Sequence, residues 1–239
     1  MSRGYSPPTL QEIRSSDNIV NTSLQAESGW NYEVGLRLRD KSSRIYWDLS
    51  AFYFELQQTI VKRENNLGQD YFINAGTTFQ PGVESLIRSA LIKSRNEKFI
   101  RGLQFSNAFT MSFFKFGNYR VGESDYSGKE LTGVPCYVSV TGLTLNLPLR
   151  FYIFVQHNYT ARIPLNDLNS ENAKEYNLIQ VKAGWRFYGT KKFVLDVSAG
   201  VDNLLDQKYS LGNDLNAVGN RYYNAAAPRN YFVRIVLGF

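Results

Sequence analysis

The amino-acid sequence predicts an all-β fold, an antiparallel transmembrane β-barrel that here forms a partial barrel of about nine to ten strands. Three observations support this prediction. Apolar and polar residues alternate along most of the chain, short and long connections follow each other in turn, and Trp and Tyr stand among the apolar positions. Successive side chains of a strand point to opposite faces, so the alternation gives each strand one apolar and one polar face.

The alternation is clearest in residues 29–39, where every second residue is apolar and the residues between are Asn, Glu, Gly or Arg. The apolar positions of this segment are Trp30, Tyr32, Val34, Leu36 and Leu38. The same pattern recurs in residues 45–53, 103–112, 178–187 and 193–202. These five segments predict two-faced strands.

Weaker alternation predicts further strands at residues 71–92, 136–147 and 151–162, and a last strand covers residues 230–239. No segment has a sustained 3.6-residue period, which would indicate an amphipathic helix. We therefore expect about nine full strands in an antiparallel arrangement.

The connections between these strands alternate in length. Short turns are expected at residues 40–44, 93–98, 148–150 and 189–192. Long connections, rich in Asn, Gly, Asp, Ser, Lys and Tyr, are expected at residues 58–70, 114–135, 163–176 and 205–228. Outer-membrane barrels have short periplasmic turns and long extracellular loops, so the pattern places the C-terminal end of the last strand on the periplasmic side.

Residues 1–28 are expected to form the tip of one more strand and another long loop. The Pro7-Pro8 pair argues against a full strand, because proline cannot donate a hydrogen bond to a neighbouring strand. About nine strands is an odd number, whereas single-chain bacterial barrels use even numbers and an open sheet in lipid leaves backbone groups unpaired. We therefore expect further strands upstream of Met1.

A soluble sandwich or a lipocalin-like barrel is the alternative, because half-buried antiparallel strands also alternate. However, the apolar positions carry Trp and Tyr besides aliphatic residues, as in an aromatic girdle at a lipid interface. The opposite positions are polar or small, including Gln104, Lys182, Arg186 and Asp196, which suits a water-filled lumen. We therefore expect the apolar face to meet lipid.

The composition excludes several other classes of protein. The mean hydropathy is -0.33, and no stretch approaches the roughly 18 apolar residues of a transmembrane helix. One cysteine, Cys136, and one histidine give a zinc site too few ligands, and no metal or other cofactor is expected. The net charge of +6 is scattered without a basic run, which favours solvated turns over binding of nucleic acid.

Several short segments occur in a characteristic order along nearly the whole chain. They are GYSPPTLQEI at 4–13, LQAE at 24–27 with NYEVGLR at 31–37, AFY at 51–53 with IV at 60–61, NAG at 74–76, GVE at 82–84, LTGVP at 131–135 and AGVDNLLDQKY at 199–209. Each is a weak signal alone. Their order and spacing, together with the terminal Phe239, resemble the barrel of TonB-dependent outer-membrane receptors.

This resemblance implies a barrel of about 22 strands around a plugged lumen, with residues 1–239 as its C-terminal part. It implies TonB-energised uptake of a scarce nutrient, usually a ferric siderophore or another iron complex, across the outer membrane of a Gram-negative bacterium. The implied partners are outer-membrane lipid and lipopolysaccharide, the iron complex and the barrel-insertion machinery. Residues 1–239 contain no recognisable plug domain, TonB box or export signal, so contact with TonB is expected only through a missing plug.

We find no nucleophile motif, phosphate-binding glycine loop or catalytic triad, so the chain is not expected to be an enzyme. Arg or Lys beside Tyr on the long loops would attract and stack against an anionic, planar iron complex. The candidate ligand-binding residues are Lys62, Arg63, Tyr119, Arg120, Arg221, Tyr222 and Tyr223. The alternative is that these are ordinary loop residues. The expected signal for barrel insertion is Tyr231, Val233, Ile235, Leu237 and Phe239.

Three other titratable residues have a functional and an ordinary interpretation. His157 could act as a base, but we expect it to be a polar residue near the outer rim of its strand. Asp202 and Asp206 could form a carboxylate pair for acid-base chemistry or calcium, but we expect them to cap the turn after the strand.

Two other functions would each need a further feature. A stand-alone barrel that acts as a passive pore or an adhesin would need an even strand count and its own export signal. A lipid hydrolase would need a Ser-His-acid arrangement, and one histidine makes that remote.

Overall fold

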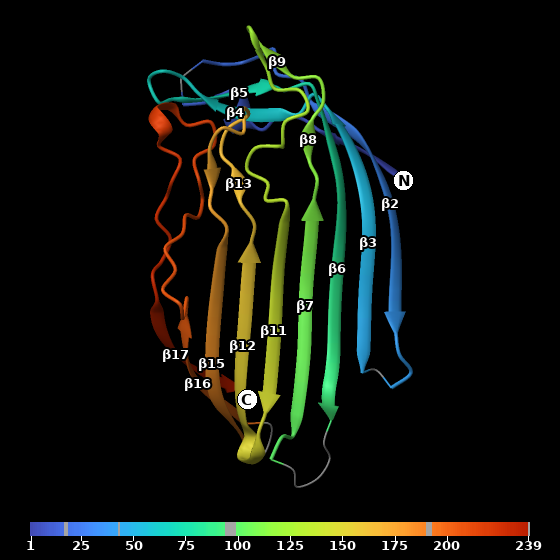
Figure 1. The fold of residues 1–239 in the computed structure, drawn as a ribbon, viewed down its shortest axis with the longest axis vertical. Coiled ribbons are helices and arrows are strands. Elements are labelled where there is room, and N and C mark those ends of the chain that lie inside the picture. Colours follow the sequence, from blue (N-terminus) through green and yellow to red (C-terminus); the bar gives the residue numbers. More distant parts are fainter. Residues whose placement is uncertain (17–18, 43, 94–98, 190–192, 239) are drawn as a thin grey trace.

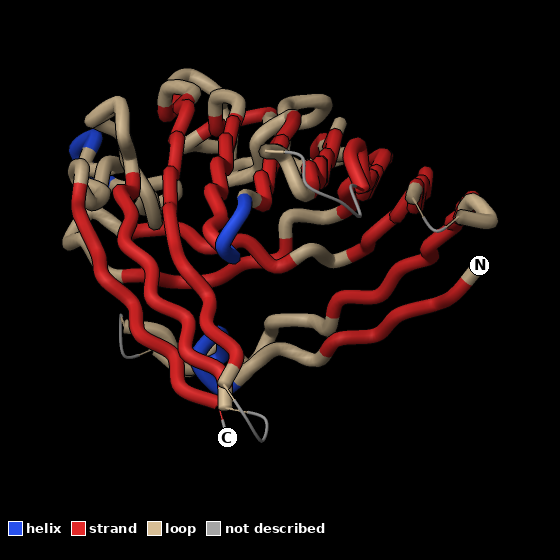
Figure 2. The backbone as a smooth tube through the Cα atoms, turned by 90° about the horizontal axis from the view of Figure 1, so that it is seen from below, coloured by secondary structure: helices blue, strands red, loops and turns tan. Residues whose placement is uncertain are grey.

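The computed structural model describes residues 1–16, 19–42, 44–93, 99–189 and 193–238. They form one long, curved antiparallel sheet with loops gathered at one end (Figure 1). Figure 2 shows the sheet bent into an open arc. In the described part of the chain, the order across the sheet is β1-β2-β3-β6-β7-β11-β12-β15-β16-β17, with β8 paired to β6 off this path.

The strands of the main sheet are β1 (Ser2–Ser6), β2 (Glu27–Arg39), β3 (Ile45–Gln57), β6 (Thr77–Lys93), β7 (Gly102–Ser112), β8 (Lys115–Phe116), β11 (Tyr137–Asn146), β12 (Phe151–Thr160), β15 (Tyr176–Tyr188), β16 (Val194–Asp202) and β17 (Asn230–Gly238). Three small hairpins lie in the loops: β4 (Ile60–Glu64) with β5 (Asp70–Asn74), β9 (Arg120–Val121) with β10 (Ser124–Asp125), and β13 (Ile163–Pro164) with β14 (Asn172–Ala173). Neighbouring strands are antiparallel throughout, so the predicted fold class is confirmed.

Among the described residues, helical structure is confined to short segments, namely α1 (Leu10–Ile13) and two 3-10 turns at Pro148–Arg150 and Val218–Asn220. Thr9 starts α1 with a capping box, in which its side chain accepts from the Glu12 backbone and the Glu12 carboxylate accepts from the Thr9 backbone. None of the described helices has the length and apolar character required to span a bilayer.

The first residues form a short strand and not a full one, as expected. β1 pairs with β2 over five residues, from Ser2 opposite Asn31 to Ser6 opposite Glu27. It ends immediately before Pro7, where the backbone donor is lost. In the ranges that the structure describes, nine long strands follow, and short and long connections alternate between them. They are β2, β3, β6, β7, β11, β12, β15, β16 and β17. These two predictions are therefore confirmed.

The predicted strand at residues 71–92 is wrong at its start. Residues Asp70–Asn74 pair instead with Ile60–Glu64, so the long loop extends to Gly76 and the wall strand begins at Thr77. The apolar residues of this hairpin, including Val61 and Ile73, pack on a buried loop cluster of Ala75, Phe116, Tyr119 and Tyr126. The apolar residues at 71–73 therefore serve packing within the loops and not the barrel wall.

The apolar face of the wall is solvent-exposed in this structure, as a lipid-facing surface would be. Val34 on β2 is 72% exposed and Val233 on β17 is 74% exposed. Aromatic rings concentrate near the two ends of this face: Tyr53 stacks on Phe79 toward the loops, and the Trp185 ring lies 5.8 Å from Phe187 toward the short turns. This arrangement is typical of the aromatic girdles of outer-membrane barrels.

The opposite face is more aromatic than predicted. Besides polar residues it carries rings that lie over glycines of the neighbouring strand. An added Cβ on Gly82 would lie 2.3 Å from the Phe52 ring, and one on Gly184 would lie 2.4 Å from the Tyr152 ring. Because glycine lets each ring lie against the backbone, the large side chains line this face without projecting far from it.

Candidate functional site in the long loops

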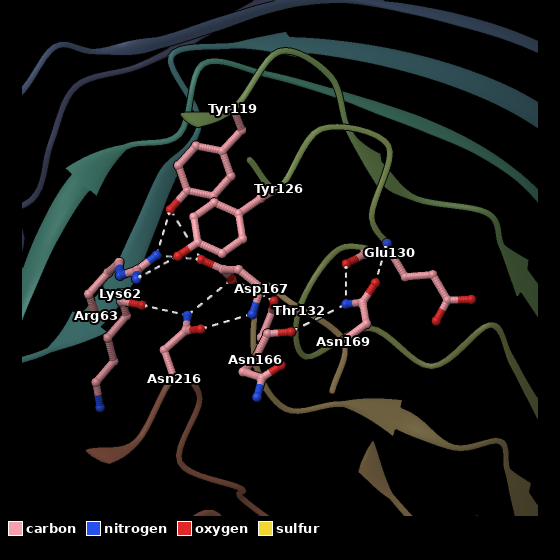
Figure 3. Close-up of polar contacts among 10 residues, drawn as sticks. All are labelled: Lys62, Arg63, Tyr119, Tyr126, Glu130, Thr132, Asn166, Asp167, Asn169 and Asn216. Carbon is pink, nitrogen blue, oxygen red and sulfur yellow. Dashed lines mark hydrogen bonds and ion pairs between the residues drawn. The ribbon is translucent and has the colours of Figure 1, made fainter. Parts of the chain in front are cut away.

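A buried carboxylate, Asp167, joins four of the long loops (Figure 3). It lies between β13 and β14, and only 1% of its surface is exposed. The residues that bind its side chain come from the loop between β3 and β6, the loop between β7 and β11, and the loop between β16 and β17. The preceding Leu165 is completely buried and anchors this segment in the loop core.

Arg63 on β4 forms the ion pair of this site. Its Nη1 lies 2.9 Å from Asp167 Oδ2, and it also donates to the Tyr119 hydroxyl at 3.1 Å. The guanidinium also faces the Tyr126 ring, at 5.3 Å from the ring centre. Arg63 is therefore held by a charge, by hydrogen bonds and by an aromatic surface together.

Hydrogen bonds complete the shell of Asp167. The Tyr119 hydroxyl donates to Oδ2 at 3.1 Å, and the Thr132 hydroxyl donates to Oδ1 at 2.6 Å. Asn216 donates to Oδ1 at 3.1 Å, and its own side-chain oxygen accepts the Asp167 backbone N–H at 3.0 Å. The same amide also donates to the Lys62 carbonyl at 3.1 Å. Both carboxylate oxygens are thus fully engaged, as a buried charge requires.

Two further contacts fasten neighbouring loops beside the Asp167 network. Asn169 binds the backbone of Glu130 twice, accepting its N–H at 2.7 Å and donating to its carbonyl at 2.9 Å. Arg162 pairs with the Glu130 carboxylate at 3.0 Å. We call the set Arg63, Tyr119, Thr132, Asp167 and Asn216 the loop hub.

The environment of the hub fixes its protonation. Burial of Tyr119 and the neighbouring charge of Asp167 raise the pKa of its phenol above the ordinary value. Burial alone would lower the pKa of Arg63, but hydrogen bonds with Tyr126 and Tyr119 and the charge of Asp167 outweigh burial and raise it. The phenol stays neutral and the guanidinium stays charged throughout the physiological pH range.

A cleft of about 560 Å³ opens beside the hub, between the β4–β5 hairpin and the loop before β17. Lys62, Arg221 and Tyr223 line it, together with Glu64, Gly68, Asp70, Asp214, Ala217, Asn220 and Asn224. Its cations are paired: Lys62 Nζ lies 2.9 Å from Asp70 Oδ2, and Arg221 Nη2 lies 3.3 Å from Glu64 Oε1. The cleft is polar, but its charges largely compensate each other.

The structure places the seven predicted ligand-binding residues in four different surroundings. Lys62, Arg221 and Tyr223 come together in the cleft. Arg63 and Tyr119 belong to the loop hub, where Tyr119 is 2% exposed, and Tyr222 is buried against Leu165, Ala173 and Ala217. Arg120 lies apart on the β9–β10 hairpin, exposed and paired with Asp125 at 2.9 Å.

Asp167, Thr132 and Asn216 were not predicted from the sequence. Asp167 stands in a stretch of Asn, Asp and Ser that indicates only a turn. The apolar residues of this loop gave no clear signal either, because Leu165 is completely buried whereas Leu168 is half exposed. The partners of Asp167 lie far away in the sequence, so their convergence could not be read from spacing.

The three other titratable residues considered in the sequence, His157, Asp202 and Asp206, make ordinary structural contacts. His157 Nε2 lies 2.9 Å from Asn177 Oδ1 on the apolar face of the wall, near the loop end of β12. Asp206 accepts the Arg229 backbone N–H at 2.9 Å, whereas Asp202 accepts from the Gln180 side chain. The turn itself is capped by Asn203, whose side chain accepts the Gln207 N–H at 2.9 Å. Across the described residues, no three His, Cys, Asp or Glu side chains group as metal ligands.

The predicted insertion signal falls on β17. Tyr231, Val233, Ile235 and Leu237 share its apolar face and are all exposed, and Phe239 lies outside the described residues. Their role in insertion stays a prediction.

Comparison with known proteins identifies the architecture. Residues 1–204 match the family described as TonB dependent receptor-like, beta-barrel. The ferric yersiniabactin uptake receptor FyuA from Yersinia pestis has a similar structure, with 19% identity, a TM-score of 0.67 and coverage of 100% of this chain and 34% of that one. The ferric preacinetobactin receptor BauA from Acinetobacter baumannii gives 15% identity, a TM-score of 0.67 and coverage of 98% and 33%.

The copper transporter OprC has a similar fold as well, with 13% identity, a TM-score of 0.74 and coverage of 98% of this chain and 36% of that one. At these identities the likeness concerns the fold alone. The chain spans about a third of the length of each of these structures.

Proposed function

The chain belongs to the TonB-dependent receptor family of β-barrels, and we propose that it supplies barrel wall and ligand-binding loops to an importer of an iron complex. The family consists of outer-membrane receptors and transporters of Gram-negative bacteria, not enzymes. Two of the similar structures are receptors for ferric siderophores. We assign transport, and its coupling to TonB through a plug, to the whole receptor, because the chain covers only about a third of such proteins.

The observation that supports ligand binding most directly is the loop hub beside the polar cleft. Loops that contact a ligand must hold their side chains in place before the ligand arrives, since ordering them on binding costs free energy. Asp167 meets this requirement by joining four loops through buried hydrogen bonds and one ion pair. Lys62, Arg221 and Tyr223 are the proposed ligand contacts, because they line the cleft next to this rigid part.

The paired charges favour an iron complex of low net charge. All four cationic candidates already face a carboxylate: Lys62, Arg63, Arg120 and Arg221 pair with Asp70, Asp167, Asp125 and Glu64. A multiply anionic complex would have to compete with these carboxylates, whereas a neutral complex would use hydrogen bonds and the Tyr223 ring. We therefore propose a neutral or weakly charged ferric complex as the substrate class.

Calorimetric titration of the complete receptor, purified in dodecyl maltoside, would test this function. The ligands are a neutral ferric trihydroxamate, ferric citrate, a trianionic ferric tris-catecholate and cupric ion. We expect the trihydroxamate to bind most tightly, and affinity for it to fall about tenfold in a combined Arg221→Gln and Tyr223→Leu variant. Arg120→Gln is the matched control and should bind like the wild type.

Two results would contradict the proposal. If cupric ion alone bound, the substrate would not be an iron complex. If the trianionic complex bound most tightly and lost affinity steeply with salt, the assignment to ligands of low charge would be wrong, although uptake of iron would stand.

A further inference from the structure

A group of polar residues interrupts the apolar face of the wall on β7, β11, β12 and β15, which are neighbours in the sheet (Figure 1). The strand register places Asn107 opposite Thr141, and Thr141 opposite His157. Ser139 and Asn177 lie in the next row of this face toward the loops. We call Asn107, Ser139, Thr141, His157 and Asn177 the polar patch.

Two members of the polar patch lie at the middle of their strands. β7 and β11 each place five side chains on this face, and Asn107 and Thr141 are the third of the five. Aromatic rings mark the two ends of the face here: Tyr137 stacks on Tyr159 toward the loops, and Phe151 begins β12 at the short turn. The hydrocarbon of a membrane lies between two such levels of rings. Polar side chains at this depth are costly and commonly mark a function.

The polar patch is a local feature of the wall. Toward one edge of the sheet, Val34 on β2 lies opposite Ala51 on β3 at the middle of the same face. Toward the other edge, Ala199 on β16 lies opposite Val233 on β17. These positions are apolar, as lipid contact requires. The polar residues of β7, β11, β12 and β15 therefore depart from the pattern of the strands on both sides.

The polar patch uses only part of its own hydrogen-bonding capacity. Asn107 Nδ2 donates to the Ser139 hydroxyl at 3.0 Å and to the Thr141 hydroxyl at 2.9 Å. His157 Nε2 lies 2.9 Å from Asn177 Oδ1. Within the described part of the chain, the two hydroxyl groups accept these bonds and donate none through their side chains, and Asn107 Oδ1 accepts none. Half-buried donors and an acceptor thus remain for a partner outside the wall.

From these observations we propose that the polar patch is a contact between two copies of the receptor that lie side by side in the outer membrane. Two identical surfaces related by a two-fold axis must complement themselves. The polar patch does so, because the Ser139 and Thr141 hydroxyl groups of one copy can donate to Asn107 Oδ1 of the other, and the reverse. The inference goes beyond the proposed function, since it concerns the outer face of the wall and no ligand.

Lipid alone would leave the polar patch unsatisfied. The ester, amide and hydroxyl groups of membrane lipids lie near the headgroups, at the level of the aromatic rings, and the acyl chains at mid-wall carry none. A polar group that faces hydrocarbon without a partner costs free energy, so the patch of a second copy is the surface that satisfies it. Leu143 is exposed beside Thr141 and adds apolar contact area.

Disulfide crosslinking of the complete receptor in outer membranes tests the inference. The reporter is Leu143→Cys in a receptor whose native cysteines, including Cys136, are replaced by serine. Oxidation with copper phenanthroline should yield a dimer on non-reducing gels, and mass spectrometry should find only the receptor in it. The control reporter is Val233→Cys, which also faces lipid but lies outside the polar patch, and it should give little dimer.

A pair of substitutions then tests the polar groups themselves. Asn107→Leu with Thr141→Val, added to the Leu143→Cys reporter, should lower the dimer yield at least about fivefold. Both new side chains are apolar and face lipid, so the monomer should still fold, as its mobility on unboiled gels will show. Val34→Leu with Ala51→Val is the matched control on β2 and β3, and it should leave the yield unchanged.

Three results would overturn the inference. Equal dimer yields from the two reporters would indicate random collisions in the membrane, and a yield unchanged by the Asn107→Leu and Thr141→Val pair would remove the role of the polar groups. A crosslink to a different protein would assign the polar patch to another partner. If neither reporter gives a dimer, and the purified wild type retains hydroxylated lipid that the paired variant loses, the patch binds lipid. None of these measurements uses an iron complex, so their failure leaves the proposed uptake function untouched.

Discussion

Arg63 Nη1 lies 2.9 Å from Asp167 Oδ2, although the two residues are 104 positions apart in the sequence. Arg63 is on the hairpin that rises from β3, and Asp167 follows the strand β12, which is several strands away in the sheet. The contact therefore lies above the loop end of the sheet and joins two loops that start from strands far apart in that sheet.

Removal of the buried carboxylate should destabilise these loops strongly. In an Asp167→Ala variant, Arg63 keeps its charge without a partner, and loss of one member of a buried pair costs about 3 to 5 kcal/mol. We expect trypsin to cut the loops much faster than in the wild type, with the fragments mapped by mass spectrometry.

The Arg120–Asp125 pair provides the control, since it joins the same residue types but lies exposed on one hairpin. Asp125→Ala should leave the cleavage rate near that of the wild type. Equal sensitivity of the two variants would show that the loop hub does not hold the loops together.

A methyl group at Gly184 should disturb the inner face of the wall. The added Cβ would lie 2.4 Å from Tyr152, whose hydroxyl donates to Asp196 at 2.8 Å, so the ring must move and lose that bond. We expect Gly184→Ala to lower the free energy of unfolding by about 1 to 3 kcal/mol, measured by guanidinium titration in detergent. At Gly35 the nearest atom to an added Cβ lies 3.4 Å away, so Gly35→Ala should have a smaller effect.

Two adjacent positions on β17 should differ in how well they tolerate a charged side chain. Ile235 lies on the apolar face opposite Val197, whereas Val236 lies on the polar face opposite Asp196. Lysine on the lipid side of a barrel costs about 2 to 4 kcal/mol near the bilayer centre. We expect Ile235→Lys, but not Val236→Lys, to reduce the amount of folded receptor in outer membranes, measured by immunoblot. The reverse order would invert the assignment of the two faces.

Acid should open the β2–β3 turn only at very low pH. Hydrogen bonds from the Ile45 backbone and the Ser42 side chain lower the pKa of Asp40 to about 2. The folded pKa is lower than the unfolded one, so this carboxylate stabilises the turn above about pH 4, and that contribution is lost as the pH falls through about 2. A titration of the Asp40 carboxyl group followed by carbon-13 NMR checks this prediction. A midpoint near pH 4 would show that the hydrogen bonds to the carboxylate are absent from the turn.

Much of the fold could be predicted because the wall strands meet different surroundings on their two faces. That difference imposes a period of two on the sequence, as in β2 and β16, and the turns and loops between the strands differ in length. The prediction failed at residues 71–74, where a run of apolar residues packs inside a loop hairpin instead of the wall. The sequence also did not predict the aromatic rings on the polar face. Each ring packs on a glycine of the neighbouring strand, and the sequence alone does not show which residues of two strands lie opposite each other.

Less of the candidate site could be predicted. Residue types suggested Lys62, Arg221 and Tyr223, which do share a cleft. The same reasoning predicted that Arg63 and Tyr119 bind the ligand, although both side chains donate hydrogen bonds to Asp167. A cationic side chain is free to bind a ligand only if no carboxylate from another loop pairs with it. A single sequence does not show which residues of different loops come into contact.

The pairing of every cationic candidate with a carboxylate also bears on how fast a ligand arrives. A rim whose charges cancel produces a weak field beyond its own surface, so it neither draws in nor repels a diffusing ion over long distances. Capture then proceeds at the rate of undirected collisions and changes little between dilute and saline surroundings.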